Sequence, residues 1–395
     1  MAPSLTFPVF DADNHLYEAE DALTRHLPES HKNLFRFVEL SGRKKLLVRG
    51  VLTEYIPNPT FEVIARPGAH MDFFSGNNPE GKTLREMTGD PIRCPESFRY
   101  PAERLKLLDE QGIASCLMFP TLASLIEERL IDEPDLTMVA VRAFNDWLFD
   151  EWSFNYEGRI FATPVVNPCV PDLGITELER ALDRGAKAVL LRPAPVSGVR
   201  GTRSPFLAEF DSFWRRVEES GVVVALHASD SGYTKYVDTW EGTTGEFVAF
   251  KPQTFAAVVD SGRSIHDTIA SAICHGMLTR FPRVKLLSVE NGGSWVPLLL
   301  KNLELAYKKM PKHFAEHPTE VFRRNVWVNP FWEDALPSLI ELVGADRVCF
   351  GSDYPHAEGL AEPLSWLDSL DGMDSVTVER IASANMYELL GVSAP

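Results

Sequence analysis

Acidic and imidazole side chains recur in this 395-residue sequence at the ends of short apolar segments. Asp13 and His15 close the first such segment, and His227, Glu290 and Asp353 close three later ones. Carboxylate oxygens and imidazole nitrogens are donors with which proteins bind divalent transition metals. The same groups can take up and release protons in catalysis. The pattern therefore predicts a metal centre with acid–base chemistry, provided that the fold brings these positions together.

The elements that must position these residues are short, β-branched apolar runs. Such near-continuous runs are typical of parallel strands buried on both faces. Helix-like stretches, among them 206–220 and 336–343, separate most of the runs. Eight strand–helix units predict an α/β fold, a (β/α)8 TIM-type barrel. The alternative is an open doubly wound sheet, but no GxGxxG follows the first strand. The predicted strands are 7–13, 114–119, 160–166, 186–191, 222–227, 284–290, 326–329 and 348–353.

Active sites of such barrels form where the strands end, so the acidic and imidazole residues are expected to converge there. Two connections are too long for simple crossovers, and we predict insertions at about 16–113 and 228–283, after strands 1 and 5. Long insertions commonly serve as lids, pocket walls or subunit contacts. We expect a single metal-dependent barrel domain over residues 1–395 that forms a homodimer or larger homo-oligomer, with the first insertion taking part.

Composition excludes several classes of partner. The 39 basic and 56 acidic residues give a net charge of −17, which repels phosphate backbones, so no nucleic-acid partner is expected. No apolar run approaches the roughly 20 residues needed to cross a bilayer, and the N-terminus lacks signal-peptide features. The five cysteines share no CxxC spacing, which favours free thiols over a thiolate zinc site. We therefore expect a cytoplasmic protein, without a membrane partner, that acts on a small molecule.

Several motifs together carry a resemblance to a known family. They are Asp11-Ala-Asp-Asn-His15, His227, Phe281-Pro282, Glu290-Asn-Gly-Gly with Trp295-Val-Pro297, and Gly351-Ser-Asp-Tyr-Pro-His356. In this order and spacing they resemble the amidohydrolase-related family, the branch of the amidohydrolase superfamily that contains aminocarboxymuconate-semialdehyde decarboxylase. The resemblance runs from Phe10 to about Leu390. It implies a TIM-type barrel, a divalent metal ion (commonly zinc, sometimes manganese or iron), and hydrolysis or non-oxidative decarboxylation.

The resemblance also implies a metal-ligand set. Asp13 and His15 match the family's strand-1 pair in its variant with an acidic first member. His227 matches the strand-5 histidine and Asp353 the strand-8 aspartate. Where many members carry a histidine at the end of strand 6, this chain has Glu290. We predict that Glu290 is a ligand whose harder oxygen donor favours Mn²⁺ or Fe²⁺, the alternative being a residue that orients His227.

Three further residues are predicted to contact substrate. Arg192 ends the fourth predicted strand, where its guanidinium can hold a substrate carboxylate. The alternative is a salt bridge that pins the 193–204 loop. Asn329 and His356 follow strands 7 and 8 and are expected to line the pocket, unless they cap turns. Whether Glu18 or His275 also binds the metal is left open.

These residues predict a metal-dependent hydrolase of a small organic substrate that uses a metal-activated water. Zinc is the expected metal, with manganese and iron as alternatives. Asp353 would move the proton of the water, and His227 would help to hold the developing oxyanion. The alternatives are a metal-dependent non-oxidative decarboxylase of an aromatic or unsaturated acid, an iron-dependent oxygen-activating enzyme, and a barrel that binds a partner without turnover.

Overall fold

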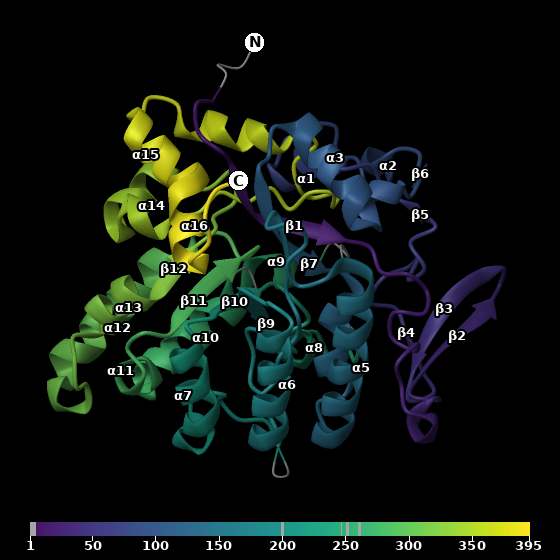
Figure 1. Ribbon diagram of the computed structural model, residues 1–395, viewed down its shortest axis with the longest axis horizontal. Coiled ribbons are helices and arrows are strands. Elements are labelled where there is room, and N and C mark those ends of the chain that lie inside the picture. Colours follow the sequence, from purple (N-terminus) through teal and green to yellow (C-terminus); the bar gives the residue numbers. More distant parts are fainter. Residues whose placement is uncertain (1–4, 199–200, 246, 250–252, 260–261) are drawn as a thin grey trace.

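The computed structural model describes residues 5–198, 201–245, 247–249, 253–259 and 262–395. Parallel strands occupy its centre, and helices surround them (Figure 1). One three-stranded sheet has the order β1-β7-β8, and a four-stranded sheet has the order β12-β11-β10-β9. The bounds of these strands are β1 (Phe10–Leu16), β7 (Ser115–Pro120), β8 (Ile160–Ala162), β9 (Ala188–Leu191), β10 (Val223–His227), β11 (Lys285–Val289) and β12 (Val326–Val328).

Isolated parallel bridges join the two sheets into a closed barrel. The bridges are Val165–Leu190 between the β8 and β9 regions, Val328–Val348 after β12, and Asn14–Tyr354 back to β1. The predicted eighth strand therefore occupies its place without forming a regular ladder. Its backbone bonds alternate between the two neighbours, since Cys349 N donates to Val328 O and Ala12 N donates to Phe350 O, both at 2.9 Å. The predicted α/β TIM-type barrel is confirmed.

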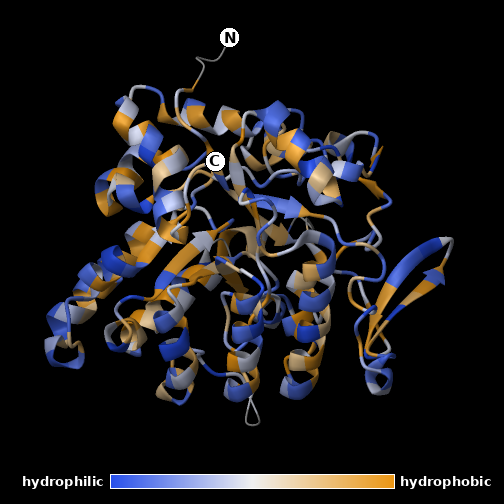
Figure 2. Ribbon diagram, in the orientation of Figure 1, coloured by the Kyte–Doolittle hydropathy of each residue, from blue (hydrophilic) through white to orange (hydrophobic). Residues whose placement is uncertain are grey.

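Helices cover the barrel strands, with their apolar faces turned inward (Figure 2). In α7, Phe213, Trp214 and Val217 are buried, and the helix ends before Gly221, whose φ of 69° is the left-handed conformation that glycine adopts readily. Burying one such apolar side chain contributes roughly 1.5–3 kcal/mol, so this face fixes the helix against the sheet. Leu336–Val343 is a helix over the predicted residues, and the predicted 206–220 helix consists of a 3-10 turn and α7.

The helix bounds are α1 (Met71–Phe74), α2 (Leu84–Thr88), α3 (Pro101–Gln111), α4 (Ile126–Arg129), α5 (Pro134–Trp152), α6 (Pro171–Asp183), α7 (Asp211–Ser220), α8 (Thr234–Glu241), α9 (Thr254–Val259), α10 (Arg263–Cys274), α11 (Met277–Arg280), α12 (Trp295–Lys309), α13 (Pro318–Asn325), α14 (Leu336–Val343), α15 (Ser375–Glu379) and α16 (Asn385–Leu390). Among the helices of the described ranges, none is long and apolar enough to cross a membrane.

The connection between β1 and β7 carries two small antiparallel sheets. They comprise β2 (Phe35–Leu40), β3 (Arg43–Val48) and β4 (Val51–Thr53), and then β5 (Val63–Ile64) with β6 (Ile92–Arg93). The β2–β3–β4 sheet projects from one side of the barrel (Figure 1). β2 and β3 form an antiparallel hairpin, and a turn at Arg49-Gly50, with φ of 54° and 79°, separates β3 from β4.

The connection between β10 and β11 carries α8 to α11. Residues 246, 250–252 and 260–261 of the predicted 228–283 insertion lie outside the described residues. The two long connections touch each other, because Ala249 N donates to Tyr55 O at 2.9 Å. The ring of Tyr55 also lies 5.7 Å from that of Phe247.

Candidate metal centre

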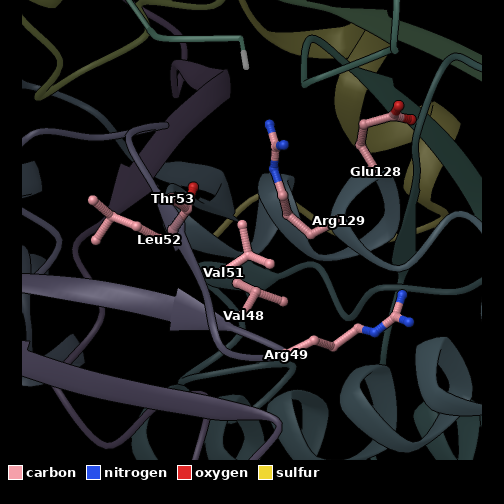
Figure 3. Close-up of a pocket in the computed structure, with 7 residues that line it drawn as sticks. All are labelled: Val48, Arg49, Val51, Leu52, Thr53, Glu128 and Arg129. Atoms are coloured by element: carbon pink, nitrogen blue, oxygen red, sulfur yellow. The ribbon is translucent and has the colours of Figure 1, made fainter. Parts of the chain in front are cut away.

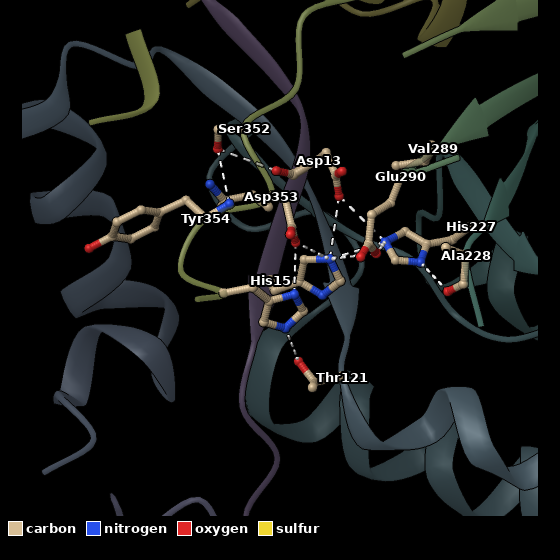
Figure 4. A network of polar contacts seen from close by, with 12 residues as sticks. Asp13, His15, Thr121, His227, Ala228, Val289, Glu290, Ser352, Asp353 and Tyr354 are labelled. Atoms are coloured by element: carbon tan, nitrogen blue, oxygen red, sulfur yellow. Dashed lines mark hydrogen bonds and ion pairs between the residues drawn. The ribbon is translucent and has the colours of Figure 1, made fainter. Parts of the chain in front are cut away.

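Donor atoms from the five predicted ligands meet where the barrel strands end (Figure 4). His15 Nε2 lies 3.0 Å from His227 Nε2 and 3.3 Å from both Asp13 Oδ1 and Asp353 Oδ1. Glu290 Oε2 lies 3.2 Å from His227 Nε2 and 4.0 Å from His15 Nε2. The structure thus brings all five side chains together, although they come from four separate strand ends.

A β-bulge in β1 contains Asp13, and His15 follows the bulge, paired with Phe119. Asp11 pairs with Cys116, but Asn14 already pairs with Met118, so β1 holds an extra residue across this stretch. Bulges re-aim side chains and are common near active sites. Asp13 lies within the irregularity, and its N–H donates to Asp11 Oδ1 at 3.1 Å.

The other ligand positions follow strands directly. His227 closes β10, and its Nδ1 donates to Ala228 O at 2.7 Å, which leaves Nε2 free to face the cluster. Glu290 and Asp353 have φ values of 55° and 56°, in the left-handed region. This conformation costs a non-glycine residue roughly 1–2 kcal/mol. Such backbone outliers concentrate at functional sites, where the surrounding structure holds them.

His356 and Asn329 form hydrogen bonds with two of the predicted ligands, Asp353 and Glu290. His356 Nδ1 lies 2.7 Å from Asp353 Oδ1, and its Nε2 lies 2.9 Å from Thr121 Oγ1. Asn329 Oδ1 accepts from Glu290 N at 3.4 Å, while its amide nitrogen donates to a backbone carbonyl at 3.3 Å. Both residues were expected to line a substrate pocket. In the structure their polar atoms bond to Asp353, Thr121 Oγ1, the backbone nitrogen of Glu290 and a backbone carbonyl.

Arg192 forms the salt bridge that was the alternative to a substrate clamp. Its side chain is buried, and Nη1 donates to Glu128 Oε2 at 2.6 Å and to Asp230 O at 2.9 Å. Nη2 donates to Pro195 O at 3.0 Å, which pins the loop after β9. We use the name Arg192 cluster for the five charged residues Glu128, Arg129, Arg192, Asp230 and Lys235, which are joined by ion pairs.

A cavity of about 340 Å³ borders the Arg192 cluster (Figure 3). Glu128 and Arg129 line one side, and the β3–β4 segment from Val48 to Thr53 lines the other. None of its lining residues is one of the predicted metal ligands.

The two residues left open as further ligands lie elsewhere. Glu18 is buried, and its Oε1 accepts from Leu122 N at 2.7 Å and Ala123 N at 3.0 Å, so it caps the turn after β7. Burial raises the pKa of Glu18 to about 7, although these N–H groups oppose the shift. His275 is exposed at the end of α10, with Nδ1 3.0 Å from Ser271 Oγ. Within the described part of the chain, neither belongs to a group with metal-ligand spacing.

The cluster is electrostatically unbalanced. Burial raises the pKa of Glu290 and of Asp353 well above the usual range, and neighbouring carboxylates add to both shifts. For Asp13, burial is outweighed by hydrogen bonds and charge interactions with His15 and His227, so its pKa is lowered. In the described ranges, no lysine or arginine forms an ion pair with any of these three carboxylates.

The donor set fits a divalent cation. Asp13 Oδ1 is buried and faces the Nε2 atoms of His15 and His227 at 3.3 and 3.4 Å, the donor atoms that an ion would share with it. Ligand atoms bound at right angles to one ion at about 2.1 Å lie about 3 Å apart, which is close to most of the spacings around His15 Nε2. One divalent ion would therefore offset two of the three carboxylate charges and could be bound by donor atoms from all five side chains.

Some residues next to the site were not given a role by the sequence reasoning. Asp11 was noted only as part of a motif, yet its carboxylate accepts from Ser352 N at 2.9 Å and Ser352 Oγ at 2.6 Å. The alternation of positions 11, 13 and 15 along one strand is the signal that could have singled it out. Thr121 and Arg104, which donates to His15 O at 2.8 Å, carry no comparable signal.

Comparison with known proteins identifies the family to which this chain belongs. The amidohydrolase family profile matches residues 98–392, and the chain belongs to this family. The crystal structure of an amidohydrolase from Mycobacterium avium subsp. paratuberculosis K-10 has a TM-score of 0.93 and 38% sequence identity. The match covers 98% of this chain and 100% of that one.

More distant similarities define the branch. A 2-amino-3-carboxymuconate-6-semialdehyde decarboxylase from Dictyostelium discoideum is 28% identical over 131 residues, which are 31% of this chain and 36% of that enzyme. A 5-carboxyvanillate decarboxylase from Novosphingobium aromaticivorans, solved with bound manganese, shares the fold with a TM-score of 0.62 at 15% identity over 98% of both chains. The chain thus lies in the branch related to aminocarboxymuconate-semialdehyde decarboxylase, as the motifs predicted.

Proposed function

We propose that this protein is a divalent-metal-dependent decarboxylase that releases CO₂ from an aromatic or unsaturated carboxylic acid without oxidation. The observation that carries the proposal is the convergence of Asp13, His15, His227, Glu290 and Asp353 on one small volume. Hydrolysis was the reaction first expected from the sequence. Apart from the relative that is named only as an amidohydrolase, the relatives reported above are decarboxylases, which favours the alternative.

Manganese is the metal that we propose in place of the expected zinc. The five converging residues would hold it, and three of them offer carboxylate oxygens, which suit Mn²⁺ better than thiolate or all-imidazole sites do. The bound manganese of the 5-carboxyvanillate decarboxylase supports this choice. A divalent ion held here would supply Lewis-acid stabilisation of negative charge on the substrate.

Side chains of the protein would deliver the proton that replaces the carboxyl group on the substrate. Decarboxylation breaks the bond between the substrate carbon and its carboxyl group, releases CO₂, and places a proton on that carbon. We assign delivery of this proton to a carboxyl oxygen of Asp353, whose Oδ1 is held by His356 Nδ1 at 2.7 Å. His227 keeps its Nε2 towards the cluster through the bond from Nδ1 to Ala228 O. Arg192, Asn329 and His356 then act as positioning residues rather than as substrate contacts.

Product analysis in D₂O tests this function. The manganese-loaded chain is incubated with a panel of aromatic and unsaturated carboxylic acids, and Asp353→Asn serves as the comparison. We expect one CO₂ and one product with a single deuterium at the former carboxyl position per substrate consumed, without oxygen uptake. Net water incorporation without CO₂ would replace the decarboxylase with the hydrolase, and oxygen consumption would replace it with an oxygen-activating enzyme. Binding without turnover across the panel would favour the non-enzymatic barrel.

The domain organisation, location and assembly state of the chain remain predictions. We propose that the chain works as one domain on a small-molecule substrate, in the cytoplasm, as a homodimer or larger assembly in which the 16–113 segment takes part. Light scattering at micromolar concentration measures the assembly state. A monomer at that concentration would contradict it.

A further inference from the structure

Asp11 is a buried acid beside the metal centre that the proposed mechanism does not use. Its side chain is 0% exposed, and its carboxylate accepts four hydrogen bonds. Oδ1 accepts from Asp13 N at 3.1 Å and Ser352 N at 2.9 Å. Oδ2 accepts from Asn14 Nδ2 at 2.9 Å and Ser352 Oγ at 2.6 Å.

The direction of each of these bonds is fixed by its surroundings. The two backbone N–H groups can only donate. Asn14 Oδ1 accepts from Arg104 Nη1, so the amide nitrogen of Asn14 must face Asp11. Ser352 Oγ accepts from Tyr354 N at 3.1 Å, and its hydrogen is donated to Asp11 Oδ2 at 2.6 Å, since the other acceptor in reach, Asp13 O, lies at 3.4 Å. Position 11 therefore requires an acceptor on both sides, and an asparagine amide there would set its NH₂ group against at least one donor.

The donors belong to the two segments that carry metal ligands. Asp13 N lies in the bulge of β1, outside the regular ladder, and Ser352 directly precedes Asp353. These segments form one isolated bridge and no regular ladder, and three backbone bonds cross between them: Ala12 N to Phe350 O at 2.9 Å, His15 N to Tyr354 O at 2.7 Å and Asp353 N to Asp13 O at 2.8 Å. They pack closely, because a Cβ on Gly351 would lie 2.7 Å from Asp13 Cβ. Asp11 thus ties the first strand of the barrel to its last at the point where both present a ligand.

We propose that Asp11 is a positioning residue whose carboxylate sets the spacing of Asp13 and Asp353 for one divalent ion. The inference rests on the proposed metal centre. It adds that the affinity of that centre depends on a residue that does not contact the ion. Loss of a hydrogen-bonding partner behind a metal ligand typically costs about 10–100-fold in metal affinity.

Manganese titration of the metal-stripped chain tests this role, followed by the electron paramagnetic resonance spectrum of bound Mn²⁺ and by thermal unfolding without metal. Asp11→Asn removes the required acceptor and its charge. Ser352→Ala removes one of the four bonds and no charge, so it separates position from electrostatics. Asn325→Ala is the matched control, since this buried amide donates to Pro282 O at 2.9 Å and Val284 O at 2.7 Å before β12, at the opposite strand end from the ligands.

We expect Asp11→Asn to weaken Mn²⁺ binding about 10–100-fold and to change the Mn²⁺ spectrum. Ser352→Ala is expected to weaken binding by a smaller factor in the same direction, and Asn325→Ala to lower the unfolding temperature without changing affinity. Wild-type affinity and spectrum in Asp11→Asn would overturn the inference, as would an equal loss of affinity in Asn325→Ala. If Asp11→Asn does not fold, wild-type affinity in Ser352→Ala overturns it. A wild-type chain that binds no Mn²⁺ would instead overturn the proposed function itself.

Discussion

Two groups of charged side chains lie near the strand ends of this barrel, and they are built in opposite ways. The Arg192 cluster joins Arg129, Arg192 and Lys235 to Glu128 and Asp230 through direct ion pairs. The metal cluster holds three carboxylates beside two imidazoles, without a lysine or arginine partner among the described residues. Burying like charges without a counter-charge is costly. The first group therefore compensates its own charges, whereas the second is the site at which we propose a bound cation.

The two groups also differ in their backbone conformation. Glu290 and Asp353 adopt left-handed φ values of 55° and 56°, while no residue of the Arg192 cluster is among the non-glycine residues with positive φ. Local strain of this kind persists only where the surrounding structure holds it. The strain is located at two of the proposed ligands.

Removing a central ligand is expected to have the largest effect on metal binding and turnover. His15 Nε2 lies within 3.3 Å of donors from three other ligands, so His15→Ala opens the middle of the cluster. We expect bound metal to fall to trace levels and turnover to be lost, as measured by elemental analysis and CO₂ release. His317→Ala, at a half-buried histidine that directly precedes α13, serves as control. Unchanged metal content in His15→Ala would show that this cluster is not the metal centre.

Asp353→Asn should separate proton delivery from metal binding. An amide oxygen can still coordinate, but the amide cannot deliver the proton, so we expect turnover to fall about 10²-fold or more. Metal content should fall far less. Asp374→Asn is the control, because Asp374 caps α15 by accepting from Thr377 N at 3.0 Å and asparagine caps equally well. Near-wild-type turnover in Asp353→Asn would contradict the proposed role of this residue in proton delivery.

Glu290→Gln removes one of the three carboxylates and keeps the size of the side chain. We expect Mn²⁺ affinity to fall about tenfold, at the lower end of the range for perturbed metal sites. Isothermal titration of the metal-stripped variant measures this, with Glu320→Gln, an exposed acid of α13, as comparison. Equal affinities in the two variants would mean that Glu290 orients His227 instead of binding the ion.

Arg192→Met should leave the metal centre unchanged and damage the fold. The substitution leaves Glu128 buried with Lys235 as its remaining ion-pair partner. Loss of one partner of a buried pair costs about 3 kcal/mol of unfolding free energy, which denaturant titration measures. If stability is retained while KM for an acidic substrate rises at least tenfold, Arg192 is the substrate clamp that the sequence first indicated.

The strand ends were predictable from sequence because a parallel barrel brings every strand's carboxyl end to one face, whatever the length of the connections. This placed Asp13, His15, His227, Glu290 and Asp353. The partners of the other residues were not predictable, because they depend on distant packing. Arg192 meets Glu128 from 64 positions earlier, and Asp11 meets Ser352 from 341 positions later. The residues 348–353 read as a regular strand, but irregular pairing at the barrel closure has no sequence signal.

Elemental analysis of protein purified without chelators tests the central claim most directly. The proposed metal centre predicts one divalent metal ion per chain in the wild type and in Arg192→Met, and only traces in His15→Ala. It would be contradicted by a metal-free wild-type chain that still releases CO₂ from its substrate. Equal metal content in the wild type and His15→Ala would contradict it as well.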